Sequence, residues 1–168
     1  MPVTAAGAVL AAGARLAAGA LLAAGAACGG DAQCGPTEAV VARIVDGDTI
    51  ELASGELVRY LMIDAPETSD GGECFSANAV TFNTDLVLGK TVALRHDVEC
   101  QDRFGRTLAY VTVAGQEVNS LMIERGYACV LHVPPNGDDR AAEFAARQDA
   151  ARAARRGLWG ACDPTPCN

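Results

Sequence analysis

Residues 44–52 read IVDGDTIEL, and residues 60–68 read YLMIDAPET. Each stretch has the β-branched, aromatic and other apolar residues of a short strand, and each carries acids beside that run. The acids are Asp46, Asp48, Asp64 and Glu67. Carboxylates that share a small volume repel one another, so a group of them needs a neutralising cation. Arg59 lies between the two stretches, and we expect both strands to share an acidic rim.

Strand-like and helix-like segments follow one another along the chain. Runs of β-branched and aromatic residues between turn residues predict strands at 40–45, 49–52, 56–63, 91–97 and 107–113. Apolar residues at helical spacing predict helices at 76–88, 116–125 and 138–156. Short strands with helices inserted after the third and the fifth predict an α+β, mainly β domain built on a small Greek-key barrel.

The first 27 residues have the composition of an export signal. They hold one base, Arg15, no acid, and mostly Ala, Gly, Leu and Val. Their apolar run is short for a membrane span and suits a secretory segment followed by small residues. We expect a protein that is secreted or lipid-anchored in the bacterial cell envelope. The expected parts are a signal at 1–27, a tether at 28–37, a domain at 38–162 and a C-terminal tail at 163–168.

Seven cysteines are present, and Cys28 lies where the export signal would end. Its context GAAC resembles a loose lipoprotein processing site with Gly25 in place of the usual Leu, so Cys28 is the lipidation candidate and a possible membrane anchor. The other six predict up to three disulfides of open connectivity, with reduced, buried thiols as the alternative. They are Cys34, Cys74, Cys100, Cys129, Cys162 and Cys167.

The chain is acidic, with 21 Asp and Glu against 13 Lys and Arg and a formal net charge of −8. Loss of the export signal would remove one base, Arg15, and no acid, so the remaining chain would be more acidic. General electrostatic binding to nucleic acid draws on many Lys and Arg, so this composition argues against it. An anionic substrate would have to be held locally, by a few arginines and a metal. Most of the acids are expected to keep a secreted surface soluble.

Three acids have the chemistry of a metal-assisted hydrolytic site. Asp48 and Asp64 lie on adjacent strands, whose pairing can bring their carboxylates to one rim. Oxygen ligands without Cys or His favour Ca²⁺ or Mg²⁺ over zinc. Glu67 follows just past the second strand, where its carboxylate can take a proton from a metal-bound water or orient that water.

Two arginines complete the set. Arg59 and Arg106 can each fork onto phosphate oxygens and stabilise the charge that develops there. The five-residue spacing from Arg59 to Asp64 places the two side chains on opposite faces of a flat strand. A bulge or a strong twist must therefore bring them together. The combination of oxygen ligands, a positioned carboxylate and two arginines predicts hydrolysis of a phosphodiester.

Several segments follow one another in the order VARIVDGDTIEL, VRYLMIDAPET, DRFGRTLAYV, VNSLMIERGYACV and RRGLWGAC. With these segments the chain resembles the thermonuclease family, the staphylococcal-nuclease-like domains, over residues 38–162. The resemblance implies a five-stranded OB-fold barrel with three helices. It also implies an endonuclease that depends on Ca²⁺, acts on DNA or RNA, and leaves 3′-phosphate ends.

The resemblance also implies roles for single residues. Asp48 and Asp64 match the family's Ca²⁺ ligands, and Ala65 stands where the family contributes a backbone carbonyl to the metal. Asp46 matches an aspartate that mainly shapes the site. The catalytic set that the family implies is Arg59, Glu67 and Arg106, with the glutamate as base and the arginines on the phosphate.

Residues 130–136 read VLHVPPN and lack the tyrosines that help to hold the nucleotide in the family's best-known member. Base stacking, worth about 1–3 kcal/mol per base, is either lost or supplied by His132 or Phe104. Two alternatives remain: a non-catalytic OB-fold module that binds nucleic acid or another ligand, and a disulfide-linked Ca²⁺-binding envelope protein. The complete set of acids and arginines favours the nuclease. A monomer is the expected state.

Overall fold

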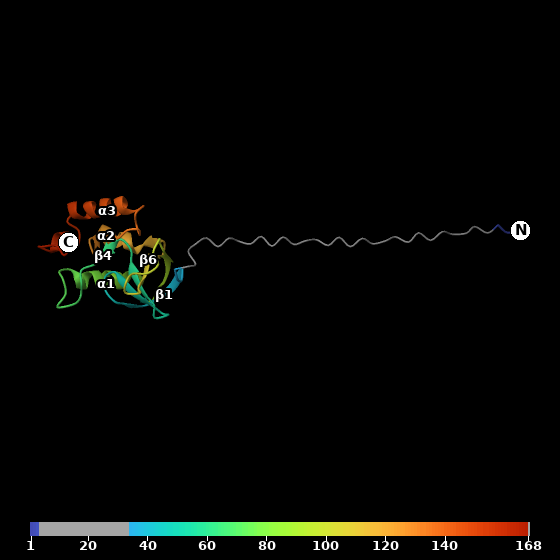
Figure 1. Ribbon diagram of the computed structural model, residues 1–168, viewed down its shortest axis with the longest axis horizontal. Coiled ribbons are helices and arrows are strands. Elements are labelled where there is room, and N and C mark those ends of the chain that lie inside the picture. The colour runs from blue at the N-terminus through green and yellow to red at the C-terminus, as the bar shows by residue number, and fades with distance from the viewer. Residues whose placement is uncertain (4–33, 168) are drawn as a thin grey trace.

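The structure is a computed structural model that describes residues 1–3 and 34–167. Cys28 and nearly all of the expected export signal lie outside the described residues, so both stay predictions. Within the described part of the chain, no helix has the length and apolar character needed to span a bilayer. The first strand starts at Glu38, and the remainder of the chain folds into one body of barrel and helices (Figure 1).

Five strands form a closed barrel. They are β1 (Glu38–Ile44), β2 (Thr49–Leu52), β3 (Leu57–Tyr60), β5 (Thr91–Arg95) and β6 (Thr107–Val113). The first three pair as an antiparallel meander, β5 pairs with β1, and β6 pairs with β5. A parallel pairing of β3 with β6 closes the barrel. The predicted fold class, an α+β, mainly β domain with a five-stranded barrel of the OB-fold type and three helices, is confirmed.

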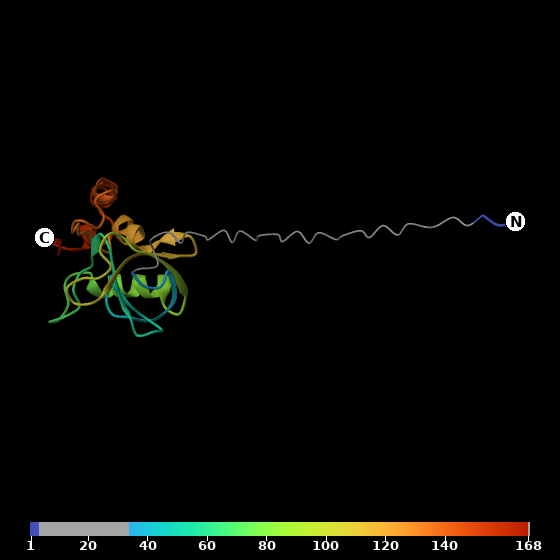
Figure 2. The same ribbon diagram turned by 45° about the vertical axis from the view of Figure 1, so that its right-hand side comes forward.

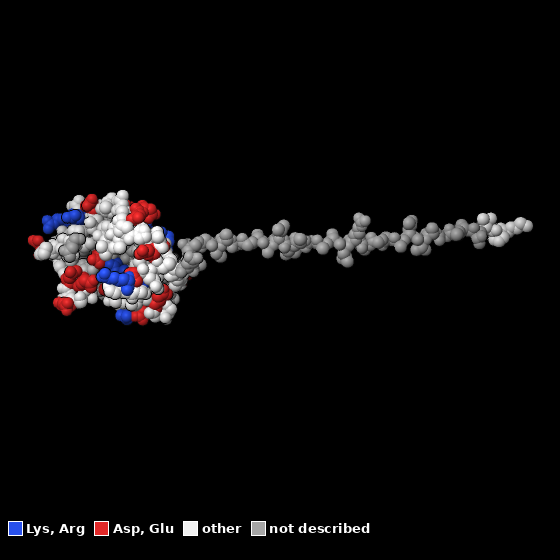
Figure 3. Space-filling view, in the orientation of Figure 1, with Lys and Arg blue, Asp and Glu red and all other residues white. Residues whose placement is uncertain are grey.

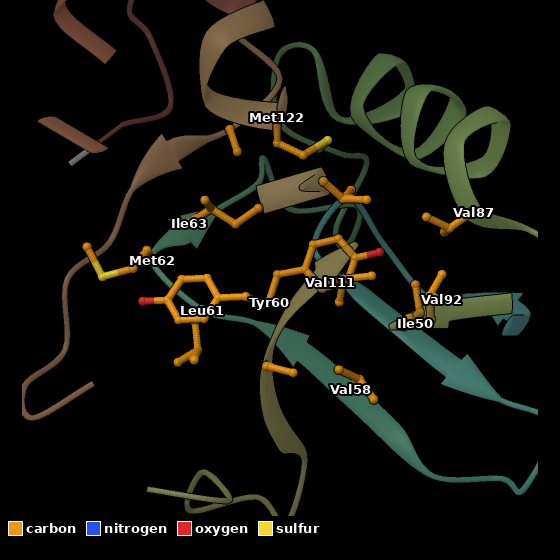
Figure 4. Packing of buried hydrophobic residues seen from close by; sticks show 14 of the residues in the cluster. Ile50, Val58, Tyr60, Leu61, Met62, Ile63, Val87, Val92, Val111 and Met122 are labelled. Carbon is orange, nitrogen blue, oxygen red and sulfur yellow. The ribbon is translucent and has the colours of Figure 1, made fainter. Parts of the chain in front are cut away.

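The barrel interior is filled by alternate residues of each strand. On β5, Val92 and Leu94 are buried while their neighbours are exposed, which is the period of a strand with one face in the core. Figure 4 shows Ile50, Val58 and Val111, from three other strands, pointing into the same interior. Full burial of such a side chain stabilises the fold by about 1.5–3 kcal/mol.

The third expected strand, 56–63, is two strands in the structure. It breaks at Met62, whose φ of 67° lies in the left-handed region. The chain then continues as β4 (Ile63–Asp64), which pairs with β8 (Cys129–Val130) in a separate two-stranded sheet. The prediction of one continuous strand is wrong at this point, because the apolar residues on both sides of the break conceal the turn.

Three helices and a short fourth one pack beside the barrel. They are α1 (Ser76–Val87), α2 (Val118–Arg125), α3 (Ala141–Ala153) and α4 (Leu158–Ala161). Helix α2 starts later than expected because the two residues before it pair with β6 as β7 (Gln116–Glu117). The expected last helix is shorter than 138–156, and its end is followed by α4 after Gly157. Figures 1 and 2 both place α3 over α2, on the side away from α1.

A buried asparagine connects α2 to the barrel. The Asn119 side chain accepts a hydrogen bond from the Val111 N–H (2.8 Å) and donates to the carbonyls of Leu61 (2.9 Å) and Ala109 (3.3 Å). These groups lie on β6 and just after β3, where the strand ladder ends. Because buried polar backbone groups need partners, Asn119 replaces the missing ladder bonds at this junction.

All six candidate cysteines are paired in the structure. Cys34 pairs with Cys100, Cys74 with Cys162 and Cys129 with Cys167. The first disulfide connects the segment before β1 to the loop between β5 and β6. The second connects the loop before α1 to the end of α4, and the third connects β8 to the C-terminal tail.

Candidate active site

The DGD corner between β1 and β2 forms one side of the site. The Asp46 Oδ1 accepts a hydrogen bond from the Asp48 N–H (3.0 Å), which closes the turn. A Cβ on Gly47 would collide with the side chains of Ala65 and Ala79. Glycine therefore permits the corner, the chain after β4 and helix α1 to approach one another closely.

One guanidinium bridges the two acids that the sequence places on neighbouring strands. The Arg59 Nε lies 2.9 Å from the Asp48 Oδ1, and its Nη2 lies 2.8 Å from the Asp64 Oδ1. Its Nη1 donates to the carbonyls of Tyr60 (2.8 Å) and Ile63 (2.6 Å). All three nitrogens are thus engaged, and the side chain is fixed in one orientation.

The break between β3 and β4 makes this bridge possible. In a flat strand the five-residue spacing would put Arg59 and Asp64 on opposite faces. The left-handed turn at Met62 redirects the chain, and the two side chains meet on one side. The distortion that the spacing requires is therefore a strand break.

Asp48 is the buried member of the group, with 5% of the residue exposed. Its Oδ2 accepts the Ala65 N–H (2.7 Å), and its Oδ1 also accepts the Thr49 hydroxyl (3.1 Å). Burial raises the pKa of Asp48 to about 7, because the opposing charge of Arg59 compensates only in part and Asp46 adds repulsion. This carboxylate therefore lies in a place where additional positive charge would be favourable.

The donors around Arg59 fit a hard divalent cation. Asp48 and Asp64 converge on one positive charge and offer only oxygen, which suits Ca²⁺ or Mg²⁺. In residues 1–3 and 34–167 there is no group of three or more His, Cys, Asp or Glu side chains arranged to hold a metal. The guanidinium of Arg59 supplies the neutralising charge that the sequence argument gave to a metal. The role of the Ala65 carbonyl stays a prediction.

Arg106 comes to the rim from the loop before β6. Its Nε donates to the Asp102 Oδ2 (2.7 Å), and its Nη1 lies 3.5 Å from the Thr49 hydroxyl. The other oxygen of Asp102 accepts the backbone N–H groups of Phe104 (2.9 Å) and Arg106 (3.0 Å). Burial acts to raise the pKa of Asp102, but these hydrogen bonds lower it below its usual value. Asp102 thus orients Arg106, a role that the spacing of Asp and Arg within DRFGR could have indicated.

Glu67 lies on the exposed loop between β4 and α1. Its N–H donates to the Glu73 Oε2 (2.8 Å), and the Glu73 N–H donates back to the Glu67 carbonyl (2.8 Å). Among the described residues, no hydrogen bond or ion pair involves the Glu67 carboxylate. The structure therefore joins Asp48, Arg59 and Asp64 directly, and it leaves this carboxylate free on an adjacent loop.

Asn83 is a further residue at the site that the sequence reasoning did not single out. It is fully buried on α1, its Nδ2 donates to the Asp46 carbonyl (3.2 Å), and its Oδ1 accepts the Tyr60 hydroxyl (2.9 Å). It thereby connects α1 to the DGD corner and to the end of β3. In the sequence, only the position of this amide among the apolar residues of the expected helix indicated that Asn83 has a special role.

A hollow of about 490 Å³ extends from the two arginines. Arg59 and Arg106 line it together with apolar side chains, and Phe104, 69% exposed, also lines it. The guanidinium carbons of Arg103 and Arg106 lie 4.7 and 5.5 Å from the centre of the Phe104 ring. An exposed ring close to two cations suits a nucleobase whose phosphates lie on arginines. The other stacking candidate, His132, pairs with an aspartate and does not line the hollow.

Comparison with known proteins finds similarity to nucleases. Residues 57–161 match the family described as "Staphylococcal nuclease homologue". The chain is 33% identical over 142 residues to "Endonuclease YhcR" of Bacillus subtilis (strain 168), which covers 76% of this chain and 12% of the relative. It is 35% identical over 130 residues to an "Uncharacterized endonuclease" of Escherichia coli O157:H7, covering 75% and 79%. It is 33% identical over 103 residues to "Thermonuclease" of Staphylococcus intermedius, covering 58% and 61%. The chain spans 12, 44 and 59% of the length of three Bacillus subtilis relatives.

Proposed function

The chain belongs to the staphylococcal nuclease homologue family, and from this premise we propose that it is a phosphodiester hydrolase of the thermonuclease type, an endonuclease acting on DNA or RNA. The observation that carries the proposal is the bridge from Asp48 through Arg59 to Asp64, at the mouth of a hollow that Arg106 also lines. Relatives named endonuclease and thermonuclease support it.

The two arginines would bind the scissile phosphate. Only 7% of the Asp48 side chain is exposed against 53% of the Asp64 side chain, so the contact of Arg59 with Asp64 is the more solvated one. An incoming phosphate would therefore displace Asp64 from the guanidinium more easily than Asp48, because exposed ion pairs contribute little. Arg106, held by Asp102, would bind a second phosphoryl oxygen.

We propose Ca²⁺ as the cofactor, held by Asp48, Asp64 and the Ala65 carbonyl. Bound there, it would supply positive charge to the phosphoryl oxygens and polarise the attacking water. Glu67, whose carboxylate has no partner among the described residues, would accept the proton of that water. The water oxygen bonds to phosphorus as the bond from phosphorus to the 5′ oxygen breaks, and the leaving oxygen takes up a proton from solvent. A 3′-phosphate and a 5′-hydroxyl result.

The protein is proposed to act outside the cytoplasm as a monomer. Three disulfides support an oxidising compartment. Whether the chain is secreted or carries lipid on Cys28 can be tested by mass spectrometry of the protein exported by its bacterial host. A lipid-modified N-terminus at Cys28 would establish the membrane anchor.

The test of the activity is cleavage of fluorescent single-stranded DNA and RNA by the oxidised protein, with Ca²⁺ or with a chelator. The Glu67→Gln variant, purified in the same way, controls for contaminating nucleases. We expect cleavage that needs both Ca²⁺ and Glu67, with 3′-phosphate products. A folded protein that cleaves neither substrate would support the non-catalytic OB-fold module instead.

A further inference from the structure

A second hollow, of about 560 Å³, lies between α1, α2 and the turn that precedes α4. It shares no lining residue with the hollow at the active site. Two aromatic rings, two aliphatic side chains and two arginines give it its chemistry. They are Phe82, Tyr127, Leu86, Leu121, Arg125 and Arg156.

Two Arg-Gly pairs, far apart in the sequence, meet at this hollow. Gly126 ends α2 with a φ of 73°, and Gly157 precedes α4 with a φ of 53°. A Cβ on either glycine would collide with the backbone of the other pair, and the Leu158 N–H donates to the Gly126 carbonyl (2.8 Å). Only glycine permits this backbone contact. It brings Arg125 and Arg156, each directly before its glycine, to the same hollow.

The same hollow contains an aromatic surface. The Phe82 and Tyr127 rings are stacked with their centres 4.1 Å apart and their planes 9° apart. Both residues are only partly buried, and both line the hollow. A flat, partly exposed pair of rings can accept a nucleobase, and such stacking tolerates any base.

The two arginines of the hollow are not neutralised. Among the described residues neither Arg125 nor Arg156 forms an ion pair with an acid, and no acidic side chain of the described chain lines the hollow. Arg156 donates one hydrogen bond, from Nη1 to the Glu124 carbonyl (3.1 Å), and keeps its other donors. In a chain with a formal charge of −8, such a cationic site is unusual. Figure 3 shows red side chains spread widely over the face in view and blue ones in a few separate groups.

A neighbouring hollow of about 300 Å³ differs in that its arginines are neutralised. Its arginines, Arg140 and Arg147, are both paired with acids that line the same hollow. Those acids are Glu117, Glu124 and Glu143. Their charges are already satisfied, so that hollow offers no site for a phosphate.

We propose that the hollow between α1 and α2 is a second binding site for the nucleic-acid strand, in which Arg125 and Arg156 bind phosphates and one base stacks on the pair formed by Phe82 and Tyr127. Guanidinium groups match phosphate oxygens, and an adjacent aromatic surface matches a base. The proposal rests on the proposed function only in its choice of ligand. A long strand contacts both hollows, whereas a strand of a few nucleotides occupies one hollow at a time.

The test is binding of labelled single-stranded DNA of about 20 nucleotides, followed by fluorescence anisotropy at several salt concentrations in the presence of a chelator. The full chain with Glu67→Gln is the parent protein, so that the strand stays intact. In the Arg125→Gln, Arg156→Gln variant we expect several-fold weaker binding. The slope of log K against log salt should fall by about 1.4, since each single-strand phosphate contact contributes about 0.7.

A charge-matched control is Arg43→Gln with Arg155→Gln. Both side chains are exposed and neither lines the hollow, so binding and salt slope should stay close to those of the parent. Tyr127→Leu should weaken binding of the long strand and leave the salt slope unchanged, because it removes stacking and no phosphate contact.

Two results would overturn the proposal: equal binding of the long strand by the parent and the Arg125, Arg156 variant, or an equal loss in the control. Thermal unfolding of each protein checks the fold. If the double variant unfolds, Arg125→Gln alone gives the test with about half the change in slope, because this side chain makes no hydrogen bond within the described chain. If the protein with Glu67 intact cleaves neither DNA nor RNA, while the Arg125, Arg156 variant selectively loses strand binding, the proposed function is refuted and this site is supported.

Discussion

The guanidinium of Arg59 lies 2.9 Å from the carboxylate of Asp48, and both side chains are almost fully buried, with 11% and 7% exposed. A buried ion pair contributes little compared with apolar residues, but removing one partner leaves a charge without compensation. In this protein Asp64 and Asp46 add further negative charge nearby. Arg59 therefore has a structural role in the unliganded protein as well as its proposed role at the phosphate.

The first prediction separates these two roles. Arg59→Met should lower the free energy of unfolding by about 3 kcal/mol in a chelating buffer, because Asp48 loses its counter-charge. Asp48→Asn in the same chain should recover a part of that loss. Urea unfolding of both single variants and the double variant forms a double-mutant cycle. Additive effects of the two substitutions would show that the pair is not coupled.

The second prediction concerns the loop that holds Arg106. Arg106→Ala should lower kcat by about 10²–10³-fold, the loss typical when one donor to a developing oxyanion is removed. Asp102→Ala should reduce kcat less, because Arg106 remains but is no longer oriented, and Asp102→Glu should restore a part of it. Steady-state cleavage of a fluorescent oligonucleotide gives kcat and KM for each variant. Asp85→Ala, which removes an exposed acid of α1, is the control.

The third prediction concerns the exposed ring at the mouth of the active-site hollow. Phe104→Ala should raise KM by about tenfold and change kcat little, since stacking of a base contributes about 1–3 kcal/mol. Val98→Ala, which shortens another exposed apolar side chain outside the hollow, should leave both constants unchanged. An unchanged KM in Phe104→Ala would show that the base does not lie on this ring.

The barrel strands and the corner beside the candidate site could be predicted from the sequence because their signals are local. The alternation of buried Val92 and Leu94 with exposed neighbours, and the DGD corner, each lie within a few residues. The left-handed turn at Met62 could not be predicted in this way. Leucine, methionine and isoleucine stand at 61–63, and such a run is typical of a strand. The turn is fixed by the pairing of β4 with β8, which is remote in the sequence.

Contacts between segments remote in the sequence also explain why the partners of some residues could not be predicted. Arg59 could be recognised as a candidate, but its contacts with Asp48 and Asp64 depend on how three segments meet. The contact of Gly126 with the backbone at Gly157 joins positions that are separated in the sequence by β8 and α3, and no local pattern connects them. Chemistry that depends on such long-range contacts needs the folded structure.

The fourth prediction concerns the asparagine that connects α2 to the barrel. Asn119→Ala leaves one buried N–H and at least one buried carbonyl without partners, and each such group costs about 1–3 kcal/mol. The free energy of unfolding should therefore fall by about 3 kcal/mol. Asn78→Ala on the exposed face of α1 should change it by less than about 0.5 kcal/mol. Chemical denaturation with intact disulfides measures both, and a similar small effect of the two substitutions would contradict this role.

The fifth prediction is a dependence of stability on pH. Burial acts to raise the pKa of Glu117, but hydrogen bonds from Arg140 and Ser120 lower it below the usual value of a glutamate. A carboxylate with a lowered pKa stabilises the fold at pH values above its unfolded pKa, and this contribution disappears as the pH falls through the folded value. The difference in Tm between the protein and Glu117→Gln should therefore be largest at neutral pH and should shrink steadily on acidification below about pH 4.5. Calorimetry from neutral to acidic pH measures this difference, and Glu38→Gln, an exposed glutamate, gives the baseline. A difference that stays constant over that range would show that the contacts of Glu117 do not favour its ionised form.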